Sequence, residues 1–374
     1  MQRLMLELTR ALPVMAAFLA GGSIAMGQAL VGGGASYARY DFRDPGAVGI
    51  ERLSLLTVPW AARVPLSRGV AVQLGGNYAI GQLVRADGGQ AEIAGLTDTD
   101  VRLFVSFRQN RVLLSAGYTL PTGHSSHTAE ESEVAGAIAS DLLPFRVSNW
   151  GGGGGPRADA AFTLPIGAVA AALTIGYGYM SDFEPLEGDE RAYRPGNEFA
   201  LGVTLAADVG RTGRVSLQGA MRSYSDDQLA AQNLYRSGNR YQALASYAFA
   251  AGRTASGVTY AGVQHREKGT VLLNDLASLG EPASQDLLLG GLGFRLPRGR
   301  AVLLPGLDGR VFRSADGVGQ GYSLGIGTSA ELPVGAVRLV PLLRLRLGHL
   351  IVRDGTESGF YGFEGALTIR LGGS

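Results

Sequence analysis

A two-residue alternation of side-chain size recurs from about residue 35 to the end of this chain and most constrains its fold. In residues 168–179, Val169, Ile175 and Tyr177 stand at odd positions, and small residues such as Gly176 stand at the even ones. Successive side chains of a β-strand point to opposite faces of a sheet, so the pattern predicts strands with one large apolar face. That face meets either a protein core or lipid.

Sixteen segments carry a strand pattern, and many exceed the about five or six residues usual for strands of soluble proteins. Their length matches the about nine to eleven residues that cross a bilayer at a tilt. The first two segments and 255–266 alternate poorly, so fourteen strands is an open alternative. The predicted strands are 35–43, 50–64, 69–84, 96–108, 111–121, 156–164, 168–181, 197–209, 213–224, 239–250, 255–266, 285–296, 300–313, 319–332, 336–351 and 358–371.

The connections between these strands alternate between short and long. Three short ones repeat a Leu-Pro-x-Gly pattern, at Pro165–Gly167, Pro297–Gly299 and Pro333–Gly335, which suits tight turns at a sheet rim. Short periplasmic turns and long external loops are typical of outer-membrane barrels, and an even strand number places both termini on the periplasmic side. The longer connections are 85–95, 122–155, 182–196, 225–238 and 267–284.

The first 29 residues read as a secretory signal peptide, with Arg3 and Arg10 followed by a short apolar run and small residues near Ala29. An uncleaved membrane anchor is the alternative. The chain has no cysteine, and no later segment has about 18 consecutive apolar residues. We therefore predict one domain, residues 30–374. It is an all-β, transmembrane, antiparallel up-and-down β-barrel in the outer membrane of a Gram-negative cell, with 122–155 as its long external loop.

The face opposite the apolar one carries charged residues among glycine, alanine, serine and threonine. Lipid outside and water inside a barrel would produce this division, and we predict that the polar face lines the lumen. The other interpretation is that these charges pair with each other and only stabilise the wall. The pore-lining candidates are Arg102, Arg108, Arg214, Arg222, Arg344, Arg346, Asp100, Asp208 and Glu331.

The 122–155 loop contains a helix signal. Thr128 and Glu131 have the spacing of a capping box, and an apolar side follows at helical spacing from Val134 to Leu143. We expect a short helix over about 129–143, ended by Pro144. An apolar helix side needs a surface to pack on, so the loop either folds into the barrel and narrows it or rests on the rim.

Few motifs in the sequence point to catalysis or to binding of metals, cofactors or nucleic acids. His124, His127, Glu130 and Glu131 lie close together, but their spacing is loose and we predict no metal site. No nucleophile, zinc-protease or phosphate-loop motif is present, so we predict neither an enzyme nor a cofactor. The net charge of +1 gives no sign of nucleic-acid binding.

Two short motifs resemble those of a known family. "GLTDTDVRLFVSF" (95–107) and "LLSAGYTLPTG" (113–123) are similar to a recurrent pattern in the outer-membrane transporter-like family named for the MetA pathway of phenol degradation. The resemblance implies a barrel related in style to FadL-type transporters, which admit hydrophobic or aromatic compounds, although the N-terminal hatch motif of that type is not evident. General porins of sixteen strands are similar in another way, because their long inward loop also follows the fifth strand.

From these observations we expect passive uptake of small, hydrophobic or aromatic compounds. The alternatives are a non-specific general porin and a structural or adhesive barrel. The expected partners are the lipid bilayer, the small-molecule permeant and the barrel assembly machinery. Such barrels usually end on an aromatic residue that this machinery reads, and here Leu371 would take its place.

Overall fold

The computed structural model describes residues 30–371 except 109–110, 253, 274–282, 318 and 352–355, so the predicted signal peptide lies outside the described residues. In the described residues the helices are α2 (Pro45–Val48) and α3 (Ala129–Ile138). The strands are β1 (Leu30–Phe42), β2 (Ile50–Ser67), β3 (Val70–Arg85), β4 (Gln90–Leu96), β5 (Thr99–Phe107), β6 (Val112–Leu120), β7 (Gly155–Ile166), β8 (Val169–Gly178), β9 (Tyr193–Arg194), β10 (Glu198–Val209), β11 (Gly213–Tyr224), β12 (Asp226–Leu229), β13 (Gln232–Arg236), β14 (Arg240–Ala251), β15 (Ala255–Arg266), β16 (Thr270–Val271), β17 (Gln285–Arg298), β18 (Ala301–Ser314), β19 (Gln320–Val334), β20 (Val337–Ile351) and β21 (Glu357–Leu371).

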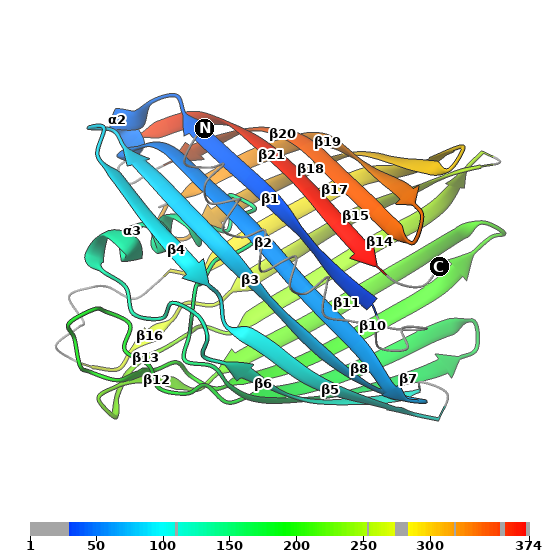
Figure 1. Ribbon diagram of the computed structural model, residues 1–374, viewed down its shortest axis with the longest axis horizontal. Coiled ribbons are helices and arrows are strands. Elements are labelled where there is room, and N and C mark those ends of the chain that lie inside the picture. Colours follow the sequence, from blue (N-terminus) through cyan, green and yellow to red (C-terminus); the bar gives the residue numbers. More distant parts are fainter. Residues whose placement is uncertain are drawn as a thin grey trace.

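One antiparallel sheet closes on itself as a barrel of sixteen strands (Figure 1). Neighbours in the sheet are neighbours in sequence, and β1 pairs with β21 from Val31 and Leu371 to Phe42 and Phe360. Closure removes the exposed sheet edges that an open sheet would leave. The sixteen predicted strands are all present, so the alternative of fourteen is wrong.

The fourth barrel strand departs from the prediction because it has two parts. Residues 85–95 were expected to be a loop, but β4 pairs with β3 between Tyr78 and Val84. The second part of the same barrel strand is β5, which pairs with β3 between Val70 and Gly75. Ala91 and Ile93 of β4 are buried. Burial of these two apolar side chains stabilises an extension of the wall where the sequence offered only a short, mixed segment.

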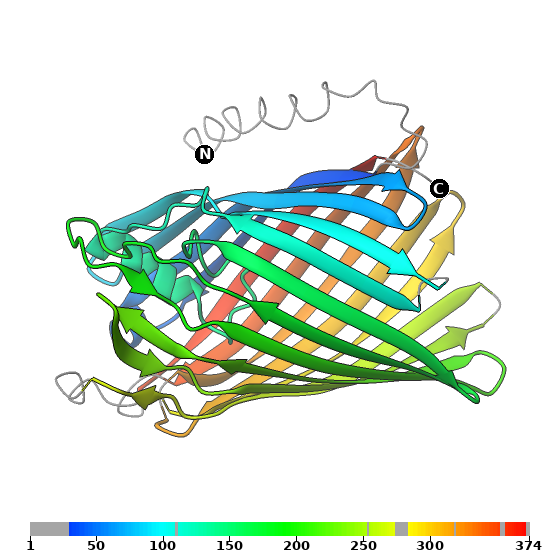
Figure 2. The same ribbon diagram turned by 90° about the horizontal axis from the view of Figure 1, so that it is seen from below.

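Both ends of the barrel follow the predicted difference in connection length. At one end, Gly167, Gly299 and Gly335 take a positive φ of 60°, which a glycine at the start of a two-residue hairpin turn allows. The prolines of the Leu-Pro-x-Gly pattern stand in the strands themselves, just before these turns. At the other end, the longer connections carry α2, α3 and a small sheet in the order β16-β13-β12-β9 (Figure 2).

The outer face of the barrel is an apolar band. Its side chains are exposed large hydrophobic groups, such as Leu173, Ile175, Ile326 and Leu345. Aromatic residues flank the band towards the long loops (Tyr118, Tyr177, Tyr179, Phe199, Tyr322 and Tyr361) and towards the short turns (Phe107, Phe162 and Tyr247). Apolar bands between aromatic girdles are typical of barrels in the outer membrane. The chain is a transmembrane β-barrel.

Within the described part of the chain, no helix is long and apolar enough to cross a bilayer.

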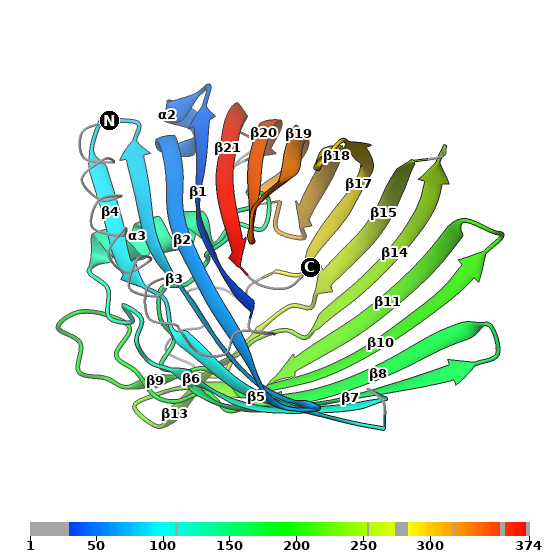
Figure 3. The same cartoon turned by 45° about the vertical axis from the view of Figure 1, so that its right-hand side comes forward.

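The hydrophobic core lies inside the barrel, near the end with the long loops. Figure 3 shows α3 behind β2, β3 and β4, on the inner side of the wall. The 122–155 loop therefore folds inward rather than resting on the rim. The buried cluster joins the loop to the wall through Tyr40, Phe42, Leu53, Leu55, Ala79, Leu83, Ala91, Ile93, Val134, Ile138, Leu142, Leu143, Val147, Trp150, Leu287, Phe312 and Phe360.

Candidate pore and its inward loop

Both ends of the 122–155 loop are tied to one carboxylate. Asp98 lies between β4 and β5, and its two oxygens accept from the backbone N–H of Gly123 at 3.0 Å and of Gly152 at 2.8 Å. The backbone N–H of His124 also donates to the Leu96 carbonyl at 3.1 Å. Asp98 thus lies at the break between the two parts of the fourth barrel strand, and its carboxylate holds the two ends of the loop together.

The loop helix α3 begins as the sequence predicts. Thr128 caps it, and Glu131 completes the capping box. It ends at Ile138, five residues before the predicted end at 143, and the following turns keep Leu142 and Leu143 buried. The apolar side therefore extends beyond the helix, because packing on the wall does not require helical backbone.

A glycine on the inner wall lets α3 approach closely. A Cβ built on Gly81 would lie 2.5 Å from Ile138 and 3.0 Å from the ring of Trp150. Trp150 is fully buried and donates from Nε1 to the Ala79 carbonyl at 3.1 Å. The loop thus packs on β3 and β4 at van der Waals distance and leaves no layer of water between.

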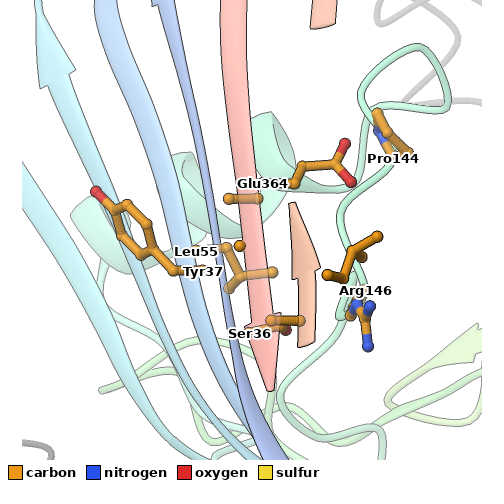
Figure 4. A pocket seen from close by; sticks show the side chains of 10 residues that line it. Ser36, Tyr37, Leu55, Pro144, Arg146 and Glu364 are labelled. Carbon is orange, nitrogen blue, oxygen red and sulfur yellow. The ribbon is translucent and has the colours of Figure 1, made fainter. Parts of the chain in front are cut away.

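The segment after α3 reaches the wall formed by β18 to β21 and the adjoining β1. The Asp141 carbonyl accepts from Arg310 at 3.3 Å, and Phe145 meets Tyr40 edge to face with 5.1 Å between ring centroids. Figure 4 shows Pro144 and Arg146 beside Glu364, around a small cavity of about 20 Å³. The loop therefore touches the inner wall at several places around one half of the barrel.

A charged cluster lies on the inner wall beside this segment. Arg346 is only 1% exposed, and its guanidinium lies 2.6 Å from Asp308 and 3.3 Å from Glu364. Arg344 pairs with the same two carboxylates at 3.5 and 3.6 Å. The hydroxyl of Tyr40 donates to Glu364 at 2.9 Å. Side chains of β18, β20 and β21 thus share one ionic network, which crosses β19 between the first two strands.

A second charged cluster runs along the wall that the loop leaves clear. Arg157 lies 3.1 Å from Asp159 and 3.8 Å from Glu198, and Arg222 continues the row at 3.5 Å from Glu198. Arg102 closes the other end, 3.9 Å from Asp159. These residues form a row across β5, β7, β10 and β11, which we call the charged row; Asp100 pairs with Arg102 at 2.5 Å beside it.

A hollow of about 270 Å³ borders the charged row. Its lining includes Arg157, Asp159 and Arg222 and the small inner-face residues Gly176 and Gly202. A Cβ on Gly176 would collide with the carboxylate of Asp159, so glycine there leaves room for the ion pairs and the space beside them. Small residues on β8 and β10 thus keep this part of the lumen wide.

The remaining pore-lining candidates lie elsewhere on the chain. Glu331 pairs with Arg295 at 3.3 Å, and Arg214 lies 3.4 Å from Asp208 near the short-turn end. Arg108 is in the turn after β5, with a positive φ of 49°, and is not on the strand wall. A role of these nine residues in lining a conducting path stays a prediction.

Sequence reasoning missed the two residues that hold the loop in place. Asp98 stood in an expected strand, where nothing distinguished it from a wall residue. Trp150 adjoins a run of five glycines, and a lone tryptophan in a polar loop was a usable signal of burial. Both act across long sequence separations, 25 residues from Asp98 to Gly123 and 71 from Trp150 to Ala79.

The histidines of the loop converge although their spacing gave no such prediction. One nitrogen of His124, one of His127 and a carboxylate oxygen of Glu131 all lie within 4.8 Å of one another. Nε2 of His124 and Oε1 of Glu131 are 3.2 Å apart, and Nδ1 of His127 is buried without a hydrogen-bond partner. Burial and the neighbouring His124 hold the pKa of His127 below its ordinary value, which favours the neutral ring.

No protein-family model matches the chain, and no curated protein matches it. The resemblance to the phenol-degradation family therefore stays a prediction.

Solved structures of other barrels are similar to the chain at low identity. An anion-selective porin from Comamonas acidovorans is 12% identical, with a TM-score of 0.41 over 91% of this chain and 98% of that one. A loop-deletion mutant of OmpT, an outer membrane protein of Vibrio cholerae, is 9% identical, with a TM-score of 0.40 over 91% and 99%. A bacterial polysaccharide outer membrane secretin is 11% identical, with a TM-score of 0.48 over 93% and 100%. Similarity this low transfers no function to the chain.

Proposed function

We propose that the chain is an outer-membrane channel through which small solutes pass passively. The path would run between the 122–155 loop and the inner face of β7 to β11. The observation that carries the proposal is the hollow beside the charged row, on the side of the lumen that the loop leaves clear. Charged, hydrated walls let solutes pass without binding them tightly, as expected of a diffusion channel.

The finer proposal concerns which solutes are favoured. Five apolar side chains share the inner face of the strands on the other side of the lumen, towards the short turns: Val258, Val302, Leu304, Val340 and Leu342. Arg295, Glu331 and Arg338 stand on the same inner face, so the five side chains form an apolar patch beside an ion-pair cluster. An apolar patch in a lumen with charged walls suits small aromatic or hydrophobic compounds that also carry a polar group. We propose these as the preferred permeants.

A general porin without such preference is the second candidate. Arg157, Asp159, Glu198 and Arg222 support it, because alternating charges favour hydrated ions and polar solutes of either sign. The two candidates predict different responses to an aromatic ion.

Single-channel recording in a planar bilayer tests both. Current steps in potassium chloride are measured alone, with benzoate, and with gluconate as a non-aromatic carboxylate. Blockade by benzoate but not by gluconate is expected for the aromatic-selective channel, and Leu304→Gln should weaken it. Steps that respond to neither anion would favour the general porin. A folded protein that never conducts would contradict a channel of either kind.

A further inference from the structure

We infer that His124, His127 and Glu131 form a binding site for a divalent transition-metal cation at the external end of the barrel. Their three donor atoms lie within 4.8 Å of one another. His124 and Glu131 are already 3.2 Å apart, a usual separation for two ligands of one small cation.

The backbone holds each of the three residues from a different direction. The backbone N–H of His124 donates to the carbonyl of Leu96 at the end of β4, and Glu131 is fixed in the capping box of α3. The backbone N–H of His127 donates to the Pro185 carbonyl at 3.0 Å, and its own carbonyl accepts from Glu187 at 2.9 Å. Ligands fixed in this way lose little conformational freedom when a cation binds.

The unpartnered nitrogen of His127 is the independent sign of a missing ligand. Buried polar atoms nearly always have a hydrogen-bond partner, so Nδ1 of His127 needs an explanation. A cation held with His124 and Glu131 would be that partner. The positive end of the α3 dipole lies nearby and opposes a cation, but the carboxylate of Glu131 offsets it.

The donor set selects the class of metal. Two imidazoles and one carboxylate suit Zn²⁺, Ni²⁺, Cu²⁺ or Co²⁺, whereas Mg²⁺ and Ca²⁺ prefer oxygen ligands throughout. Three protein ligands also leave at least one position open to water or to a solute. All three ligands belong to the 122–155 loop, so a bound cation would fix the part of that loop whose backbone is hydrogen-bonded to residues 185–187.

Calorimetric titration with Zn²⁺ alone tests the site on the full-length barrel. The protein carries no histidine tag, is folded in detergent micelles and is treated with a chelator that is then removed. We expect one tightly bound Zn²⁺ per chain. Binding should weaken at least about tenfold in His127→Gln and in Glu131→Gln. The Glu131→Gln variant keeps the hydrogen bond that caps α3, because glutamine also completes a capping box.

Two other histidines supply matched controls. His265 pairs with Asp286 at 2.8 Å and His349 with Glu357 at 3.0 Å, and the clusters of three metal-ligating side chains found in the described residues do not include either pair. His265→Gln and His349→Gln should leave Zn²⁺ binding unchanged. Binding that is absent from the wild type, unaffected in both loop variants or equally weak in the controls would overturn the proposal. Circular dichroism establishes that each barrel is folded, and conduction plays no part in the readout.

Discussion

Arg346 is the most deeply buried charged side chain of the described residues, and it shows how the wall handles charge. Its guanidinium satisfies Asp308 and Glu364 at once. Removing Arg346 would leave both carboxylates with Arg344, at the longer distances of 3.5 and 3.6 Å, and loss of a buried partner is strongly destabilising. We predict that Arg346→Leu lowers the free energy of unfolding by about 3 kcal/mol, measured by urea unfolding in lipid vesicles.

The exposed pair of Arg214 and Asp208 is the control for this prediction. Both side chains are more than half exposed, so water already screens their interaction. Arg214→Leu should change the unfolding free energy by less than about 1 kcal/mol. Equal losses of unfolding free energy in Arg346→Leu and Arg214→Leu would mean that burial of Arg346 has no energetic consequence.

The 122–155 loop depends on Asp98 because both of its ends donate to that carboxylate. We predict that Asp98→Ala leaves the N–H groups of Gly123 and Gly152 without their partner and loosens the loop from the wall. Limited proteolysis of the folded barrel should then cut within 122–155 several times faster. Asp98→Asn retains one acceptor oxygen, so its cleavage rate should fall between those of the wild type and Asp98→Ala. A cleavage rate unchanged by Asp98→Ala would show that packing alone holds the loop.

Close packing of α3 on the wall gives a second prediction about the loop. Gly81→Val would place two methyl groups where Ile138 and Trp150 now lie, so the helix should move away from β3. The fluorescence of Trp150 should shift to longer wavelength as water reaches its ring. Trp60 on β2 adds a constant background, so the difference from wild type is the quantity to compare. An unchanged spectrum would contradict the close contact.

The strands could be predicted from sequence because lipid and lumen impose opposite demands on alternate residues, as at Ile175 and Gly176. The short segment with Ala91 and Ile93 could not, since its burial comes from α3, which is distant in sequence. The inward position of α3 stayed open for the same reason: Val134 and Ile138 reveal an apolar side but not the surface that covers it.

The charged clusters illustrate a different limit. The alternation assigned residues such as Arg344 and Arg346 to one face, yet their pairing with Asp308 depends on the register of β18, β19 and β20. A strand shifted by two residues would keep the same faces and change every ion pair. The charged row and the hollow beside it therefore follow from the assembled barrel and not from local sequence.

The whole molecule combines a closed wall with a loop that occupies one half of its lumen. Loop contacts gather on β1 to β4 and on β17, β18 and β21, whereas the hollow lies beside β7 to β11. A loop in this position should narrow the passage without closing it. Removal of the loop should therefore widen the passage and leave the closed wall in place.

The most direct test compares single-channel conductance of the wild type with that of a variant in which residues 129–149 are replaced by a short glycine-serine linker. A shortening of the external 225–238 loop serves as the control. We predict steady steps in the wild type, larger steps when 129–149 are removed, and wild-type steps in the control. Equal steps with and without residues 129–149 would contradict an inward loop that narrows an open channel.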